Sequence, residues 1–457
     1  MIRAELAQLL RLAFPIILTQ LSQMGMGVAD TVMAGRYGAV DLAGVALGGN
    51  LFWPLILLVS GILMAITPSV SQLHGAGEQA RAGEVVRQAG WIALAGSLLL
   101  IIGFSNSEAL FRFVEVDPAA IPVAVAYLDA LCWGVAPLLG YFALRYLCEG
   151  MSWTLPAMLI AFTGLLLKIP LNYLFMHGFS VGPFDMPALG GAGCGWASAL
   201  IMWTEFVVLA AIVARSRMRA TRVFERLSAP QPAEILRLVR LGVPIGLTTF
   251  LEISLFSIVA LLVGRLGVEA VAAHQIAMNI GGILFMIPMA LGIAASIRVG
   301  FNVGARDLAA ARRCGGLAIG VALCVAASAA GVLLGFRESI VGLYTTDAAV
   351  LALAAELLLF VAIWQLVDNT QVTTIGTLRG FKDTRMPMVI ALLAYWVVGL
   401  PIGVAFGFGW VDVPALQGLR GFWVGFCVAL LVAAVVLLSR FAWLSRRDER
   451  ILAFTHR

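Results

Sequence analysis

Long apolar runs alternate with short polar stretches along the whole chain. Runs of about 20 apolar residues can cross the hydrocarbon core of a bilayer. Twelve such runs are centred near residues 22, 55, 98, 132, 166, 203, 251, 283, 325, 362, 397 and 430. Turns that contain Gly and Pro separate the runs, and none is long enough to form a soluble catalytic domain. The pattern predicts an all-α polytopic membrane protein with twelve transmembrane helices.

The two halves of this pattern repeat each other. The stretch "FPIILTQLSQMG" from Phe14 matches "VPIGLTTFLEIS" from Val243, and "MPALGGAGCGW" later matches "VPALQGLRGFW". Six spans per half is an even number, so both halves cross the membrane in the same direction. This predicts two six-helix lobes related by a pseudo-two-fold axis along the membrane normal. The lobes are expected at residues 1–215 (N-terminal) and 238–457 (C-terminal, with a tail), joined by a cytoplasmic linker at 216–237.

Composition supports the membrane assignment and narrows the function. Hydrophobic residues make up 61% of the 457 residues and charged residues 12%, whereas soluble proteins have about 45–50% and about 25%. The net charge of +5 comes without a basic cluster interleaved with aromatics, so no nucleic-acid partner is expected. The six scattered cysteines show no metal or redox spacing. No cofactor and no obligate protein partner are predicted.

The distribution of basic residues predicts the orientation of the chain. With the N-terminus inside, only five arginines fall in outer loops, and Lys168 falls inside a span. Most of the 30 basic residues then lie in inner segments, including the linker and the tail. Cytoplasmic segments are enriched in Lys and Arg. Both termini are therefore predicted to be cytoplasmic.

Six acidic residues fall inside the predicted spans, and they are the main candidates for function. A charge at the bilayer centre costs about 2.5–3.5 kcal/mol on insertion scales. Glu252 and Asp368 look deepest, with no basic residue near them in sequence. Glu252 corresponds to Gln23 in the repeat, and Asp30 lies nearly two turns beyond Gln23. The remaining three acids, expected nearer span ends or in local pairs, are Asp129, Glu205 and Glu356.

Polar residues accompany the two deepest acids. Trp364 is four residues before Asp368, hence on the same helix face, and its aromatic ring could hold a cation. The other neighbours are Thr248, Thr249, Ser254, His274, Gln275, Asn279, Gln365, Asn369, Thr370 and Gln371. Such groups can serve as hydrogen-bonding contacts between helices or as ligands. Burial raises the pKa of carboxylic acids, so the acids could carry a proton. With amide oxygens they could instead bind sodium.

Several stretches together resemble the multidrug and toxic compound extrusion (MATE) family, in particular its bacterial NorM-like branch. They include "FPIILTQLSQMGMGVADTVMAGRYGAVDLAGVALG", "PLNYLFMHG", "AAHQIAMNI", "RVGFNVGA" and "GTLRGFKDTRMP". In order, they cover essentially the whole chain.

The resemblance implies a multi-pass protein of the bacterial inner membrane that confers antibiotic resistance. It implies two lobes that alternate between inward and outward openings. It also implies antiport, in which organic cations, dyes and fluoroquinolones leave in exchange for protons or sodium. Membrane lipid is the only other partner expected.

The resemblance also assigns residues. Glu252, Asp368 and Asp30 match the ion-coupling acids, and the first two would hold sodium in a sodium-coupled member. The resemblance adds Asn279 and Asn172 as residues that would support the ion or the substrate. Trp364, Gln275 and His274 are candidates for the same role because they lie near the acids in the predicted spans. Sodium-coupled members often carry Tyr where this chain has Trp364. Trp has no hydroxyl oxygen for a sodium ion, so this departure favours protons.

Three other functions fit the sequence less well. A lipid-linked oligosaccharide flippase of the same superfamily would need a basic cavity, whereas the spans here carry acids. A membrane-embedded enzyme would need a clustered His/Asp or metal motif, and none is visible. The chain is therefore not expected to be an enzyme. A passive channel fits two lobes with single buried acids poorly.

Overall fold

A computed structural model describes residues 2–181 and 184–455. Twelve helical segments in it are long and apolar enough to cross a membrane, so the predicted all-α architecture with twelve spans is confirmed. The chain forms two compact units, each with its own hydrophobic core. The N-terminal unit is Pro15–Gly246, and the C-terminal unit is Met1–Phe14 with Leu247–Arg457. The units divide inside the helices α1 and α9. The lobe and linker bounds drawn from the repeat stay a prediction.

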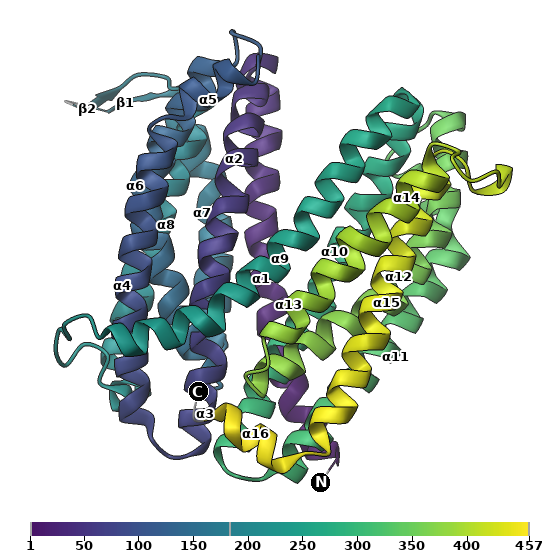
Figure 1. The fold of residues 1–457 in the computed structure, drawn as a ribbon. Coiled ribbons are helices and arrows are strands. Elements are labelled where there is room, and N and C mark those ends of the chain that lie inside the picture. Colours follow the sequence, from purple (N-terminus) through teal and green to yellow (C-terminus); the bar gives the residue numbers. More distant parts are fainter. Residues whose placement is uncertain (1, 182–183, 456–457) are drawn as a thin grey trace. The chain divides into compact units, whose positions relative to one another are not determined.

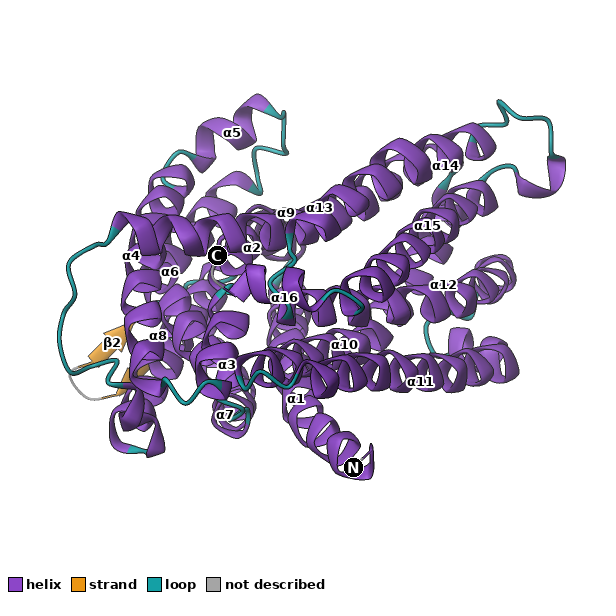
Figure 2. Ribbon diagram, turned by 60° about the horizontal axis from the view of Figure 1, so that its bottom comes forward, coloured by secondary structure: helices purple, strands orange, loops and turns teal. Residues whose placement is uncertain are grey.

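The N-terminal unit is organised around one buried helix. In Figures 1 and 2, α6 lies beside α2, α4 and α8, and these contacts bury most of its length. Its elements are α1 (Ile2–Tyr37, shared), α2 (Ala39–Leu63), α3 (Ile66–Gly75), α4 (Gln79–Phe104), α5 (Ser107–Phe113), α6 (Ile121–Gly150), α7 (Leu155–His177), the antiparallel strands β1 (Phe179–Val181) and β2 (Phe184–Met186), α8 (Ala192–Arg215) and the 3₁₀ turn η1 (Arg217–Thr221). The small hairpin between α7 and α8 is an addition that apolar periodicity does not predict.

The C-terminal unit has the same plan around α12, which packs against α10, α11 and α15. Its elements are α9 (Pro232–Val263, shared), η2 (Gly264–Leu266), α10 (Val268–Gly304), α11 (Leu308–Gly342), α12 (Ala348–Gly380), α13 (Arg385–Leu392), the π-helical segment η3 (Leu393–Gly399), α14 (Leu400–Gly407), η4 (Pro414–Leu416), α15 (Leu419–Ser445) and α16 (Asp448–Thr455).

The internal repeat is present in the backbone. Gly77 and Arg306, which are 229 residues apart, both have positive φ angles of 77° and 60° just after a helix end. Ser152 and Lys382 repeat this at the ends of α6 and α12, with φ angles of 58° and 61°. The left-handed region is uncommon for residues other than Gly. Its recurrence at matching turns shows that the two halves share one chain path.

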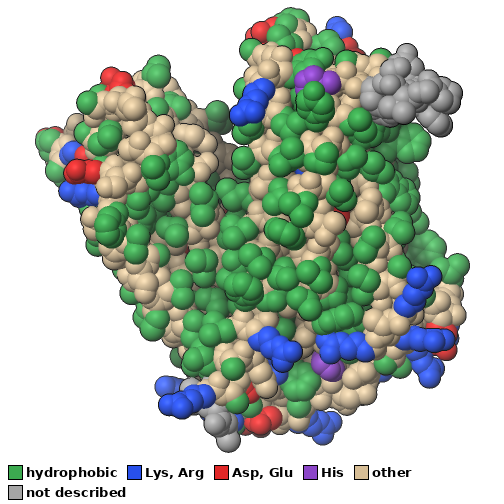
Figure 3. All heavy atoms as spheres, turned by 180° about the vertical axis from the view of Figure 1, so that it is seen from behind, with side chains coloured by type: hydrophobic (Ala, Val, Ile, Leu, Met, Phe, Trp, Pro, Cys, Tyr) green, Lys and Arg blue, Asp and Glu red, His purple; other side chains and the backbone are tan. Residues whose placement is uncertain are grey.

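Apolar side chains on the outside of each unit fit a lipid environment. Leu99 is 72% exposed and Leu261 75% exposed, although both lie in predicted spans. Figure 3 shows apolar side chains over the middle of each unit, with Lys and Arg gathered toward the ends. Because lipid provides no hydrophobic drive between helices, close backbone packing must hold them together. A Cβ atom on Gly376 would lie 2.1 Å from the carbonyl oxygen of Gly292, so α10 and α12 touch directly.

Candidate functional site: two buried acid clusters

The C-terminal unit brings Glu252 of α9 and Asp368 of α12 together. Asp368 is 0% exposed and Glu252 is partly buried, and the two side chains interact electrostatically. Neither carboxylate oxygen of Asp368 has a hydrogen-bond partner among the described residues. A buried polar group without a partner is costly. Asp368 is thus a buried acid without a hydrogen-bonding or ion-pair partner among the described residues, and a second acid lies within electrostatic reach of it.

Amide oxygens next to Asp368 are left unpaired as well. Asn369 uses its Nδ2 to donate to the backbone oxygen and Oε1 of Gln365, at 2.7 and 3.0 Å. Gln371 uses its Nε2 to donate to the Tyr395 hydroxyl. The remaining oxygens, Asn369 Oδ1 and Gln371 Oε1, have no partner in the described part of the chain. The amide N–H groups of both side chains therefore donate within the protein, while their amide oxygens remain without a donor beside Asp368.

Tyr395 joins this cluster, although no sequence motif marks it. It lies in the π-helical segment η3 and is fully buried. The charges of Glu252 and Asp368 both act on it. Trp396 Nε1 donates to Leu251 O at 3.4 Å, which ties η3 to α9 beside Glu252. π-Helical turns often occur at functional sites, but in sequence this segment is simply part of an apolar span.

Basic charge near the acid pair comes from further along α12. Arg379, eleven residues after Asp368, is the basic side chain whose charge acts on Glu252.

Aromatic rings cover Trp364, which is 3% exposed. Its ring centroid lies 5.6 Å from that of Phe256 and 5.9 Å from that of Trp423. His274 packs edge-on against Trp423 at 5.7 Å, and its two ring nitrogens have no hydrogen-bond partner among the described residues. Trp364 and His274 therefore form a packed aromatic cluster within the C-terminal unit rather than an open ring face.

The other two predicted polar residues of this unit lie elsewhere. Gln275 and Asn279 are exposed, one turn apart on α10. Asn279 Oδ1 accepts a hydrogen bond from the Tyr344 hydroxyl at 3.3 Å. The structure thus separates them from the buried face that carries His274.

In the N-terminal unit the span acid Asp30 has a basic partner. Asp30 of α1 accepts from Lys168 Nζ at 2.8 Å and from Asn172 Nδ2 at 2.7 Å, both on α7. Lys168 also donates to Cys194 O at 3.2 Å and to the Ser198 hydroxyl. Asp30 is therefore neutralised and firmly held. The sequence places Lys168 in a span, but nothing in it identifies the partner.

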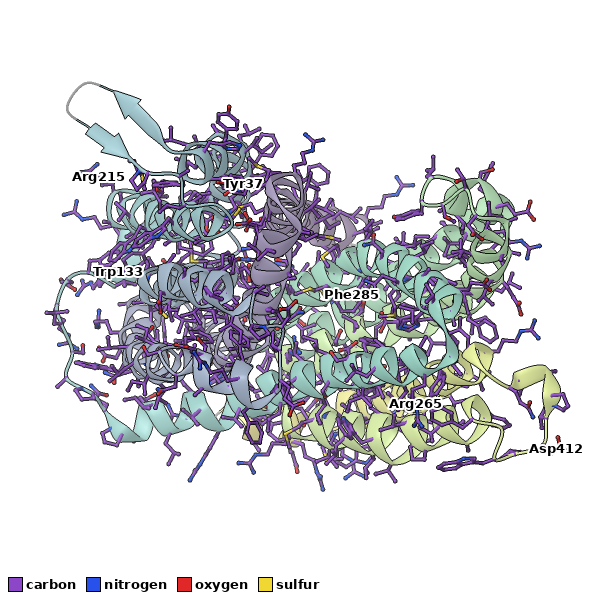
Figure 4. All side chains as sticks on the ribbon, turned by 90° about the horizontal axis from the view of Figure 1, so that it is seen from above. Tyr37, Trp133, Arg215, Arg265, Phe285 and Asp412 are labelled. Atoms are coloured by element: carbon purple, nitrogen blue, oxygen red, sulfur yellow. The ribbon has the colours of Figure 1, made fainter. Side chains whose placement is uncertain are left out.

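The C-terminal ends of α1 and α7 are also in contact. Tyr37 of α1, labelled in Figure 4, packs edge-on against His177 of α7, with 5.4 Å between the ring centroids. The contact joins the two helices that supply Asp30 and Lys168.

A second buried ion pair contacts Gln23, the repeat equivalent of Glu252. Arg145 Nε donates to Glu149 Oε1 at 2.8 Å, and its Nη atoms donate to Gln20 Oε1 at 2.9 Å and Gln23 Oε1 at 3.3 Å. Gln23 is the residue that corresponds to Glu252. At this position the N-terminal unit therefore has a neutral amide that accepts from an arginine, and the C-terminal unit has a carboxylate.

The remaining span acids have distinct surroundings. Glu356 pairs with Arg420, with Nε and Oε1 2.5 Å apart, as expected for a local pair. Asp129 is exposed. Glu205 is buried, at 4% exposure, and its Oε1 has no partner among the described residues.

Comparisons with known proteins agree over the full length. The sequence profile of the MatE family matches residues 15–174 and 244–405. The chain is 42% identical to proteins named "Multidrug resistance protein MdtK" from Yersinia pseudotuberculosis (serotype O:1b, strain IP 31758) and from Yersinia enterocolitica (strain NCTC 13174 / 8081). Each match spans 450 residues, 98% of this chain and 97% of the relative.

Solved structures share the fold. The eukaryotic MATE transporter AtDTX14 superposes with a TM-score of 0.85 at 20% identity, covering 100% of this chain and 99% of that one. A MATE structure in the bent conformation gives a TM-score of 0.86 at 19% identity, covering 99% and 97%.

The packing of Trp364 makes a first prediction. A Cβ atom on Gly281 would lie 2.3 Å from Cζ3 of Trp364, whereas Gly282 has no atom within 4 Å. Overpacking a buried contact costs about 1–3 kcal/mol. Gly281→Ala should therefore lower the melting temperature of the purified protein, and Gly282→Ala, the matched control, should not. Equal melting temperatures would show that the ring is not held by this contact.

The Asp30–Lys168 pair makes a second prediction. Removing one partner of a buried ion pair costs about 3–5 kcal/mol, whereas removing both is often nearly neutral. Lys168→Met should strongly destabilise the protein in thermal unfolding, and adding Asp30→Asn should restore most of the loss. If the double variant loses the sum of the stability lost in the two single variants, the two side chains do not stabilise each other.

Proposed function

Because this chain belongs to the MatE family, we propose that it is a multidrug efflux antiporter of the bacterial inner membrane. It exports organic cations, including dyes and fluoroquinolone-type drugs, in exchange for a coupling ion. Near-full-length similarity to proteins named for multidrug resistance supports this proposal. The twelve apolar helices support a multi-pass membrane location.

One observation carries the coupling proposal: Asp368 is buried without a partner among the described residues, and a second acid, Glu252, interacts with it electrostatically. In the N-terminal unit Asp30 and Glu149 each have a basic partner within 2.8 Å, but both oxygens of Asp368 are unpaired in the described structure. Two adjacent carboxylates in a low-dielectric interior favour taking up positive charge. The pair is therefore suited to bind a cation on one side of the membrane and release it on the other.

The surroundings of the pair favour a proton as that cation. A proton needs no coordination shell, whereas sodium needs several oxygen ligands. Trp364 offers an indole nitrogen instead of a hydroxyl oxygen, and its ring is packed against other aromatic rings. A sodium ion would depend on the oxygens of Asn369 and Gln371 beside Asp368. The Tyr395 hydroxyl is already hydrogen-bonded to Gln371.

Ion uptake and release can drive the transport cycle. Moving one charge through a potential of about 100 mV yields about 2.3 kcal/mol, which is enough to shift a conformational equilibrium strongly. With a proton bound, the acid pair loses one negative charge and its burial becomes less costly. Without it, the charged pair favours a state in which water or a cationic substrate reaches it. Asp30 belongs to the proposed set, but a cation there must compete with Lys168 and Asn172.

The basic linker supports a cytoplasmic location for both termini. The positive-inside rule places clusters of arginine in the cytoplasm. The segment after α8 is fixed to α4, where Glu84 accepts from Arg87, Arg226 and Ser228. The arginines at the end of α8 and in the linker are Arg215, Arg217, Arg219, Arg222, Arg226 and Arg237.

A lipid-linked oligosaccharide flippase is the alternative function. It would require a cavity with uncompensated basic residues, but the buried bases Lys168 and Arg145 each pair with an acid. The charge balance therefore favours the export of cations.

Transport in proteoliposomes tests the proposal. Ethidium movement is followed with an imposed proton gradient and, separately, with a sodium gradient. We expect the proton gradient to drive transport by the wild type. Glu252→Gln and Asp368→Asn should abolish it without loss of folded protein, because the neutral side chains cannot exchange a proton.

A matched control keeps the result specific. Glu108→Gln removes an exposed acid paired with Arg112 and should transport normally. Full export by a well-folded Glu252→Gln variant would refute the coupling role, and transport driven only by sodium would refute the choice of proton.

A further inference from the structure

A pocket between α7 and α8 of the N-terminal unit lies outside the two acid clusters. Its volume is about 350 Å³, which falls within the range of about 300–1,000 Å³ found for small-molecule sites. Every residue that lines it belongs to the segment 153–212, so the pocket is complete within one unit. Nothing in the coupling mechanism uses it.

The pocket wall is apolar except at two threonines and one acid. Leu159 and Leu167 of α7 line it together with Ile201 and Val208 of α8. The two threonines in the lining have satisfied hydroxyls, because Thr163 donates to Leu159 O and Thr204 to Leu200 O, both at 2.8 Å. Glu205 is the acidic residue of the lining.

Glu205 is built into the pocket. It is 4% exposed, and its Oε1 has no hydrogen-bond partner in the described structure. That oxygen lies 3.0 Å from the position a Cβ atom would take on Gly164 of α7, so the glycine makes room for the carboxyl group. A buried carboxylate without a hydrogen-bond donor is unfavourable unless a ligand supplies a donor or a positive charge.

The buried charges of the N-terminal unit indicate that the ligand would carry a positive charge. Lys168 pairs with Asp30 and Arg145 with Glu149. Among the described residues of the N-terminal unit, these four and Glu205 are the charged side chains that are buried. The charges of Lys168 and Arg145 also act on Glu205, but each base forms its ion pair with another acid, so Glu205 is the buried acid of this unit without an ion pair of its own among the described residues.

A basic residue does lie near one end of the pocket. Trp153 belongs to the lining, and the Arg217 guanidinium stacks over its ring at 4.7 Å. That arginine is engaged by the aromatic ring and does not neutralise Glu205 by direct pairing.

We propose that this pocket binds an amphiphilic organic cation, with its apolar groups against α7 and α8 and its charged centre at Glu205. The proposal rests on the proposed function, because such cations are the exported class, and it adds a second, separate place where they bind. The pocket would hold the substrate within the N-terminal unit, whereas Glu252 and Asp368 of the C-terminal unit would exchange the ion.

The test compares two probes of the same shape and opposite charge, tetraphenylphosphonium and tetraphenylborate. Binding of each is measured by equilibrium dialysis on full-length protein in lipid nanodiscs. Glu205→Gln removes the electrostatic attraction between the carboxylate and the cation, so tetraphenylphosphonium should bind about tenfold more weakly, with tetraphenylborate unaffected. Thr204→Trp, which fills the pocket while leaving Glu205 in place, should weaken the same probe.

Two variants serve as matched controls, and both should bind tetraphenylphosphonium as the wild type does. Glu108→Gln removes an exposed acid and controls for charge. Ser328→Trp places the same bulk at an exposed position of α11 and controls for size.

The outcomes separate this site from the coupling site. The proposal is supported if Glu205→Gln and Thr204→Trp both weaken the binding of tetraphenylphosphonium. The same weakening should be measured when each change is made in protein that also carries Asp368→Asn. Unchanged affinity in both variants overturns it, as does equal binding of the two probes, which would indicate an apolar or lipid-filled crevice.

Transport gives a second readout. In proteoliposomes the apparent KM for tetraphenylphosphonium should rise about tenfold in Glu205→Gln while the maximal rate stays near wild type. Failure of gradient-driven transport in the wild type would count against the proposed function and leave the binding result standing.

Discussion

The compensation of buried charge is the constraint on which this structure depends. Carrying an ionised group into a span is energetically costly, so such groups persist where they are paired or where they bind something. The N-terminal unit pairs two of its buried acids with Lys168 and Arg145. The C-terminal unit leaves Glu252 and Asp368 together, with unpaired oxygens on Asp368 and on the neighbouring amides. This contrast separates buried acids that have a basic partner from Asp368, which has none among the described residues.

The duplicated fold makes the contrast possible. Turns with positive φ recur at matching positions, so both halves follow the same path. On that shared scaffold the charges differ: Gln23 accepts from Arg145 in one half, and Glu252 takes the corresponding position in the other. The helices of both units are alike, but Asp30 and Glu149 are ion-paired in one unit, whereas Asp368 has no partner among the described residues in the other.

The twelve spans are predictable from sequence. In a chain of this composition, a run of about 20 apolar residues has the length and the polarity of a helix that crosses a bilayer. Glu252 and Asp368 are predictable for a related reason, since an isolated acid in such a run stands out. The pairing of Lys168 with Asp30 is not predictable, because the two are far apart in the chain and meet only when α1 packs on α7.

Two features of the C-terminal cluster also depend on tertiary packing. Tyr395 lies in a π-helical turn that has no sequence pattern of its own. Trp364 suggests an open ring face when only its own helix is considered, but Phe256 and Trp423 from other helices cover it.

The most direct test of the central idea is whether substrate binding displaces a proton from the acid pair. Tetraphenylphosphonium is added to purified protein in a weakly buffered solution that contains a pH indicator, and released protons are counted against an acid standard. We expect proton release by the wild type and none by a folded variant that carries both Glu252→Gln and Asp368→Asn. Wild-type protein that binds the substrate without releasing protons, or a double variant that releases as many, would contradict the coupling role of the pair.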